Sequence, residues 1–269
     1  MFVGYDLEIR NQMSYTYATS GNDIYSDMNK IVKKEICKFI KSDGSIDASA
    51  MQDNWFPEIN RHIFISHSSK DKQTAIMLAG WLRDTFGLSS FIDSCLWGYC
   101  DDLLRKIDNK YCYNRSTGYY NYKERNYSTS HVHNMLSTAL NTMIDKCECL
   151  FFLNTKNSIK SEEDIFKITE SPWIYNELST IKTIRKKIPN YINKNDIAKS
   201  RRDSAMFEMK DEFPSFQYKV DISGLIRIDF DFFEQWKNEN TNPRYPLLYL
   251  YQKTNALEQL QKGDEYIGI

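Results

Sequence analysis

The chain has 269 residues with a net charge of −1 at pH 7, and 41% of them are hydrophobic, which allows a large core and excludes a disordered chain. The near-zero charge gives no electrostatic reason to expect nucleic acid as the main partner, so no nucleic-acid partner is expected. The ten glycines form neither a G-x-G-x-x-G motif nor a complete phosphate-binding loop, which argues against a hydride-transferring Rossmann enzyme and excludes a P-loop NTPase.

The sequence also indicates where the protein works. No apolar run approaches the ~18 residues of a membrane span, and the first residues lack the charged-then-apolar pattern of a signal peptide. We therefore expect a cytoplasmic location and no membrane partner. The six cysteines are scattered along the chain, so free thiols are a better interpretation than a disulfide framework.

The first predicted elements lie in the N-terminal third. Residues 1–60 contain one helical pattern, over residues 24–40, and are interpreted as an N-terminal extension. Residues 61–66 form a short apolar run that stops at polar residues, as a buried strand does. A helix follows, with Ser68 as its cap and Gly87 at its C-terminal end.

The alternation of strands and helices continues through the middle of the chain. Residues 89–93 are predicted as a strand and residues 101–107 as a short helix. The pattern breaks down over residues 111–127. An apolar face at helical spacing then predicts a helix over residues 132–144, which leads into an apolar strand at residues 149–153.

The last third contains one clear helix start. Ser171-Pro172 combines a capping residue with a proline at the first helical position, and the helix is expected to reach about residue 187. Residues 186–202 are predicted as a basic polar loop, and residues 216–222 as a further strand. Residues 226–232 alternate at period two but also fit a helix face, so both interpretations stay open.

This order of elements predicts the fold class and the position of a site. Strands that alternate with helices imply an α/β protein with a mainly parallel sheet covered on both faces. Ligands of such sheets bind beyond the carboxyl ends of the strands. The residues to examine are therefore 66–69, 93–97 and 154–158, which follow three predicted strands.

Three segments in this order resemble a known family. They are residues 62–71 (HIFISHSSKD), residues 91–93 (FID) with Trp97 after them, and residues 171–178 (SPWIYNEL). Together they resemble the Toll/interleukin-1 receptor (TIR) domain family, and more narrowly the bacterial TIR proteins of anti-phage systems such as Thoeris. The resemblance covers about residues 61–178 well and the remainder weakly.

The resemblance implies a flavodoxin-like sheet flanked by helices. It places a TIR domain at residues 61–238, with an insertion at about residues 109–130 and a C-terminal extension at residues 239–269. The second loop of the predicted site lacks the proline-glycine pair that is common in animal receptor members of the family.

The resemblance also implies an activity. Many TIR proteins cleave NAD⁺ at the nicotinamide–ribose bond with a glutamate that matches Glu177 here. It further implies that Ser66, His67 and Ser68 line the nucleotide site, together with the residues from Asp93 to Trp97. NAD⁺ is then a substrate, and no cofactor or metal is expected.

The chemistry of this substrate suits a single carboxylate. Trp173 and Glu177 are four residues apart and share a helix face, so an indole and a carboxylate could flank a sugar ring. Breaking the glycosidic bond develops positive charge on the ribose, which a fixed carboxylate stabilises. Nicotinamide leaves as a neutral molecule without a general acid. The alternative for Glu177 is an ordinary solvated helix residue.

Structural alternatives stand beside the other candidate residues. Ser68 also suits a simple helix cap. Asp93 is either a ribose partner or a loop anchor, and Trp97, expected in an irregular loop, either stacks on a base or packs as a lid. The pairs His131/His133 and Cys147/Cys149 contain ligand types at spacings that do not match a zinc site.

Residues 111–127 hold six of the eighteen tyrosines. Such residues suit a ligand or partner surface, but an insertion ordered by packing of the tyrosine rings is the favoured interpretation.

Two functions follow from the sequence. The first is a TIR enzyme that releases nicotinamide and a free, cyclic or conjugated ADP-ribose product, which signals to a separate effector after an infection-derived trigger. The second is a non-catalytic scaffold that acts through TIR–TIR assembly. A filled or collapsed pocket around Glu177 would favour the scaffold.

Overall fold

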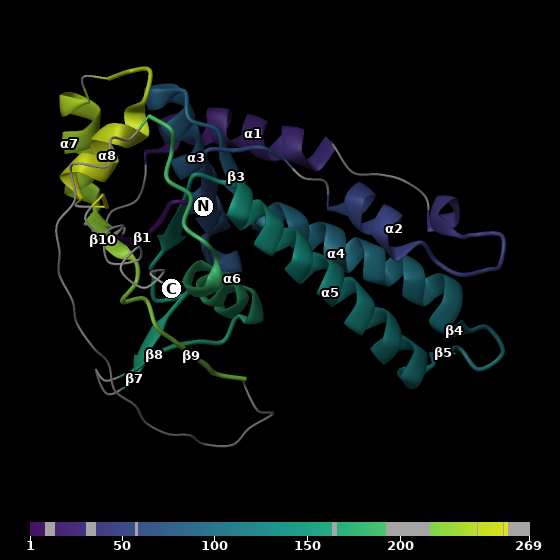
Figure 1. Ribbon diagram of the computed structural model, residues 1–269. Helices are drawn as coiled ribbons and strands as arrows, with labels where there is room; N and C mark the ends of the chain where they lie inside the picture. The colour runs from purple at the N-terminus through teal and green to yellow at the C-terminus, as the bar shows by residue number, and fades with distance from the viewer. Residues whose placement is uncertain are drawn as a thin grey trace, which may run out of the picture.

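The computed structural model describes residues 1–8, 14–30, 36–56, 59–162, 166–191, 216–240, 242–254 and 256–257. Its centre is a parallel five-stranded sheet (Figure 1). In spatial order the strands are β10 (Ile226–Asp229), β1 (Val3–Glu8), β6 (Cys149–Leu153), β2 (Ile63–Ser66) and β3 (Ser90–Ile92). The α/β class with a mainly parallel sheet is therefore confirmed.

The predicted strands at residues 61–66, 89–93 and 149–153 are confirmed as β2, β3 and β6. Every residue of these three strands is buried. Such continuous burial explains their apolar sequences, because a parallel sheet is covered on both faces.

The position of β1 differs from the prediction. β1 lies between β10 and β6 and pairs with both in parallel, so the start of the predicted N-terminal extension belongs to the sheet. Its sequence, VGYDLE, contains a glycine and an aspartate, which are poor strand formers. The strand signal was therefore weak, although tertiary packing buries most of the segment.

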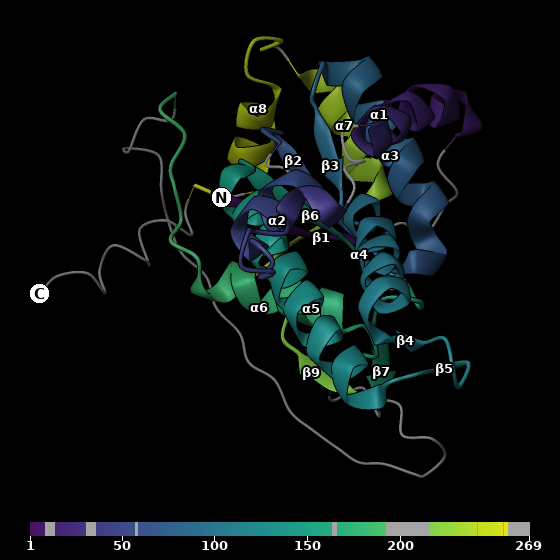
Figure 2. The same cartoon turned by 90° about the vertical axis from the view of Figure 1, so that its right-hand side faces the viewer.

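Helices cover both faces of the sheet. α6 (Pro172–Thr183) lies over the face that carries Gly4, where a Cβ atom would be 3.5 Å from Ile181 of this helix. α7 (Phe230–Glu239) covers the opposite face, where the rings of Phe151 and Phe233 are 6.4 Å apart. Figure 2 shows α6 and α7 on opposite sides of β1 and β6.

α1 (Ala18–Lys30) packs directly on α3 (Lys72–Phe86). Two glycines allow this close approach, because a Cβ atom at Gly80 would overlap the carbonyl oxygen of Tyr17, and one at Gly21 would overlap that of Ile76. The helix predicted at residues 24–40 is confirmed in part: α1 begins earlier and ends at Lys30, residues 31–35 lie outside the described residues, and Ile36–Phe39 form a short 3-10 helix.

The capping signals are confirmed. Ser68 caps the short turn that leads into α3, and Gly87 ends that helix in the left-handed conformation, with φ 67°. Ser171 caps α6 by accepting a hydrogen bond from the backbone N–H of Ile174 at 3.3 Å. The helix ends at Thr183, a little earlier than expected.

A pair of long helices extends away from the sheet, with a hairpin at its tip (Figure 1). It consists of α4 (Ser94–Ile107), a π-helical turn (Asp108–Cys112), β4 (Tyr113–Asn114), β5 (Tyr119–Tyr120) and α5 (Tyr122–Lys146). Both helices begin earlier than predicted. The first turns of α5 have few apolar residues, so periodicity did not mark them; instead Asn121 caps the helix.

The C-terminal third contributes strands to the central parallel sheet and to a small antiparallel sheet. Residues 226–232 form a strand and then a helix, since Asp229 ends β10 and caps α7. The strand expected at residues 216–222 is β9 (Tyr218–Val220), which pairs with β8 (Phe166–Thr169) in a small antiparallel sheet completed by β7 (Lys160–Glu162). Most of the predicted loop at residues 186–202 lies outside the described residues.

The other α-helices of the described residues are α2 (Ala48–Trp55) and α8 (Pro246–Lys253). α8 lies within the predicted C-terminal extension, yet Leu250 and Tyr251 are fully buried, and the Tyr251 ring is 4.7 Å from that of Phe2. This helix is therefore part of the core. Residues 258–269 lie outside the described part of the chain.

Candidate functional site

Four polar side chains meet at the carboxyl ends of two neighbouring strands. Ser66 is the last residue of β2, His67 follows it, Asp93 follows β3, and Glu177 reaches them from α6. All four have 0% of their surface exposed. Such complete burial of charged and polar groups is uncommon unless they are paired, so their partners decide what the cluster can do.

Glu177 is bound through one carboxyl oxygen. The Ser66 hydroxyl donates to Oε2 at 2.6 Å, while Oε1 is buried without a hydrogen-bond partner among the described residues. Burial and then the negative charge of Asp93 raise the pKa of Glu177 well above its ordinary value, against the opposing effect of the Ser66 hydrogen bond. The raised pKa therefore favours the neutral form of the carboxyl group over a wider pH range than for an exposed glutamate.

His67 is fixed from both sides of its ring. Nδ1 lies 2.6 Å from the carbonyl oxygen of Ser68, so this nitrogen carries a proton and donates it. Nε2 lies 2.9 Å from Oδ1 of Asp93 and 3.0 Å from the Ser94 hydroxyl. Burial alone lowers the pKa of His67, but the Asp93 carboxylate and the hydrogen bonds outweigh it, so the pKa is raised.

Asp93 connects the two strand ends. Its Oδ2 accepts a hydrogen bond from the backbone N–H of His67 at 3.1 Å, and its other oxygen faces the His67 ring. This is the anchoring role that the sequence left open as one of two alternatives. Ser94, which lies within the predicted segment 93–97 but was not named as a site residue, completes the contact with the His67 ring.

Ser68 and Trp97 border this cluster. The Ser68 hydroxyl accepts from the backbone N–H of Lys70, which is the simple capping role. Trp97 lies in α4 and not in an irregular loop, because the helix begins directly after Asp93. Its ring is 5.4 Å from that of His67, and its indole N–H has no hydrogen-bond partner within the described part of the chain.

Trp173 lies apart from the cluster. Its ring packs edge-on against that of His133 in α5, with the centroids 5.3 Å apart. Asn176 and Thr180 of the same helix both bond to Asn141 of α5. Trp173 thus faces α5, whereas Glu177, one turn further on, reaches the sheet.

The loop after β6 has a structural role. The Thr155 hydroxyl and the Asn157 amide donate to the Asp71 carboxylate at 2.5 and 2.8 Å. These bonds fasten residues 154–158, the third predicted part of the site, to the turn before α3. No described bond joins this loop to Glu177.

Asp6 is a further buried carboxyl group that the sequence did not indicate. Asp6 and Ser66 both align with Phe152 across the sheet, so the two side chains lie on the same face, two strands apart. Burial raises the pKa of Asp6 despite a hydrogen bond from Asn154. It escaped notice because β1 was not expected in the sheet.

The cluster provides hydrogen-bonding groups and no described metal centre. Among the described residues, no group of three or more His, Cys, Asp or Glu side chains could hold a metal ion. Likewise, none of the described helices is both long and apolar enough to cross a membrane.

Comparison with known proteins finds no match for this chain, whether among protein-family models, curated proteins or solved structures.

Proposed function

We propose that this chain is a bacterial TIR-family enzyme that cleaves NAD⁺ at the nicotinamide–ribose bond, with Glu177 as the essential carboxylate. The observation that carries the proposal is the state of Glu177. Its carboxyl group is buried at the carboxyl ends of the strands, bound by Ser66 through one oxygen, with the other oxygen free of partners in the described residues. The sequence motifs around Ser66, Asp93 and Glu177 add support.

The proposed reaction requires Glu177 to ionise. In the closed cluster the raised pKa favours the neutral form of the carboxyl group. NAD⁺ has a positively charged pyridinium ring, and a positive charge beside a carboxyl group lowers its pKa. Binding of the substrate therefore releases the proton of Glu177. The resulting carboxylate lies beside the ribose on which positive charge develops.

The bond change itself follows from this charge. The C–N bond to nicotinamide breaks, its electron pair stays on the pyridine nitrogen, and the positive charge moves to the ribose ring. The Glu177 carboxylate stabilises that charge, while Ser66 holds the carboxylate in place. Water, or a nucleophilic atom of another group, then adds to the ribose carbon and loses a proton.

We further propose the biological setting that the family resemblance implies. The ADP-ribose product is free, cyclic or conjugated, and it acts as a signal for a separate effector in anti-phage defence. The protein works in the cytoplasm and responds to an infection-derived trigger.

One observation favours a second candidate, a non-catalytic TIR scaffold that acts through self-assembly. Glu177 is 0% exposed, so neither solvent nor substrate reaches its carboxyl group in this conformation. The enzyme must open around Glu177 before it can bind NAD⁺, whereas a scaffold has no such requirement.

Nicotinamide release separates these two candidates. The chain is incubated with NAD⁺, with and without an extract of phage-infected cells, and nicotinamide and all adenine products are followed by mass spectrometry. Glu177→Gln keeps the shape of the side chain and should lower release by about 100-fold or more. Glu234→Gln, an exposed position on α7, is the matched control and should not change it.

Equal release by the wild type and Glu177→Gln would refute the role of Glu177. No release under any condition, combined with self-association that Glu177→Gln leaves intact, would support the scaffold.

A further inference from the structure

A second region of the molecule has features that NAD⁺ cleavage does not use. Residues 108–127, here called the tyrosine arm, form the tip of the long helical pair (Figure 1). Its six tyrosines are all exposed, by 41% to 80% of their surface: Tyr111, Tyr113, Tyr119, Tyr120, Tyr122 and Tyr127. Among the described residues, the expectation that ring packing orders this insertion is confirmed for one pair, Tyr113 and Tyr120, whose ring centroids lie 5.1 Å apart across the β4–β5 hairpin.

Polar bonds also order the arm. The buried carboxylate of Asp108 accepts from the Ser128 hydroxyl at 2.7 Å and from Arg125 at 2.9 Å. Asn121 caps α5 with its side chain, and its own backbone N–H donates to the carbonyl oxygen of Cys112 at 2.8 Å. The arm thus presents its tyrosines from a fixed frame, and little entropy is lost when they bind a partner.

The charges on the arm are mainly positive. It carries four Lys or Arg residues against two acidic residues, and one of those, Asp108, is buried and paired with Arg125. Within the described residues Lys110, Arg115 and Lys123 form no ion pair. The near-zero charge of the whole chain conceals this local excess, which favours an anionic partner.

The composition of the arm narrows the class of partner. Residues 108–127 contain no Leu, Ile, Val, Met, Phe or Trp. The buried centre of a protein–protein interface is usually apolar and rich in such residues. Tyrosine rings with cations and amides between them match a surface on which bases stack and phosphates are neutralised.

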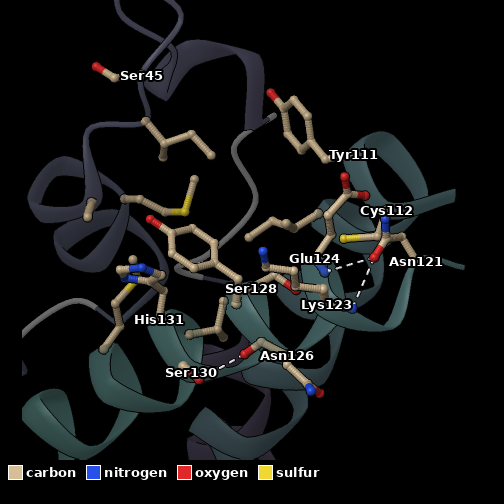
Figure 3. Close-up of a pocket in the computed structure, with 17 residues that line it drawn as sticks. Ser45, Tyr111, Cys112, Asn121, Lys123, Glu124, Asn126, Ser128, Ser130 and His131 are labelled. Atoms are coloured by element: carbon tan, nitrogen blue, oxygen red, sulfur yellow. Dashed lines mark hydrogen bonds between the residues drawn. The ribbon is translucent and has the colours of Figure 1, made fainter.

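Two open cavities flank the arm. The larger has a volume of about 1070 Å³ and lies between the arm, the segment leading into α2, and α5. Figure 3 shows Tyr111 at one end of this cavity and His131 at the other. A second cavity of about 330 Å³ lies beside Tyr120 and Arg125, whose guanidinium is 5.3 Å from the ring centroid. Both have room for unstacked bases.

From these observations we infer that the tyrosine arm binds single-stranded nucleic acid. Bases stack on the exposed rings, and Lys110, Arg115 and Lys123 neutralise phosphates. Duplex nucleic acid is a poorer ligand, because its bases are already stacked and do not reach the rings. The arm lies at the far end of the helical pair from α6, which carries Glu177 (Figure 1), so this binding is separate from the proposed NAD⁺ cleavage.

Fluorescence anisotropy with the full chain tests the inference. The probes are fluorescein-labelled oligo(dT) and oligo(U) of about 12 nucleotides, with a duplex of equal length as comparison. We expect binding at about 50 mM salt, with a slope of about −2 in log affinity against log salt for three neutralised phosphates. The duplex should bind more weakly.

Matched variants locate the site. The double variant Tyr119→Ser with Tyr122→Ser removes two rings that are 76% and 80% exposed and should weaken binding by about tenfold or more. Tyr15→Ser, a 65% exposed ring outside the arm, should not change it. Glu177→Gln should also leave binding intact, which separates this result from the outcome for NAD⁺.

Four outcomes would overturn the inference. They are no binding at low salt, equal loss with Tyr15→Ser, equal affinity for the duplex, and full competition by a poly-glutamate peptide, which would indicate an acidic protein surface. Concentration-dependent self-association that disappears in the double variant, without oligonucleotide binding, would instead identify a second copy of the chain as the partner.

Discussion

The buried polar cluster and the tyrosine arm reverse the usual distribution of side chains in opposite ways. Glu177 and its partners are polar groups with 0% exposure, while the six tyrosines of the arm are large rings in contact with solvent. The cluster lies where β2, β3 and α6 meet, and the packing of the surrounding core offsets the unfavourable burial of its polar groups. The arm lies at a tip, where exposed rings cost the fold little.

From this comparison we expect a single substitution to lower the free energy of unfolding most when it lies within the cluster. His67→Ala removes the imidazole ring beside the buried Asp93 carboxylate and two ring hydrogen bonds. Loss of one partner of a buried pair costs about 3–5 kcal/mol, and we expect a decrease of that size in the free energy of unfolding, measured by urea denaturation.

His62→Ala is the matched control for this measurement. His62 is exposed, and its ring bonds only to Ser89 among the described residues, so its loss should cost about 0.5–1.5 kcal/mol. Equal decreases in the free energy of unfolding for the two variants would show that the buried Asp93–His67 pair stabilises the fold no more than an exposed histidine does.

The pH dependence of stability sharpens the comparison further. Because the pKa of Glu177 is raised on folding, the folded chain keeps a proton that the unfolded chain has lost above about pH 4.3. Stability conferred by the neutral acid is therefore lost as pH rises from there through the folded-state pKa. Glu177→Gln does not titrate, so its stability relative to wild type should rise with pH by up to about 1.4 kcal/mol per unit.

Urea unfolding of both proteins from about pH 5 to about pH 8 measures this difference. The raised pKa of His67 acts in the same direction, but it is present in both proteins, so its contribution largely cancels. The exposed control Glu234→Gln should show a flat difference. A flat difference for Glu177→Gln as well would mean that Glu177 is ionised and solvated in the folded chain.

The smallest effect is expected in the arm. Tyr122 is 80% exposed, so Tyr122→Ser should change the free energy of unfolding by no more than about 0.5 kcal/mol. Phe151→Ala, which removes a fully buried ring of β6, should cost about 3–5 kcal/mol in the same assay. A cost above about 1 kcal/mol for Tyr122→Ser would show that the arm packs its tyrosines after all.

Local signals explain which elements could be predicted. The apolar run of β6, the left-handed Gly87 and the Ser171-Pro172 start of α6 each depend on neighbouring residues alone. β1 and the first turns of α5 could not be found in this way. Their apolar signals are weak, and their stability comes from contacts with distant parts of the chain or from a capping side chain.

The candidate site could likewise be predicted only in part from the sequence. The sequence by itself identified the residues at the strand ends, since Ser66 and Asp93 each mark the point where an apolar run stops. Only the tertiary structure joined Glu177 to Ser66, closed the cluster to solvent and turned Trp173 towards α5.

The tyrosine arm could also be predicted only in part from the sequence. The sequence determined that tyrosines and cations gather at residues 108–127, but composition is the same whether rings pack inward or face solvent. In the tertiary structure the rings face solvent, because the polar bonds of Asp108 and Asn121 order the arm without burying its rings. Local pattern fixes which face of an element is apolar; only the assembled fold determines what covers that face.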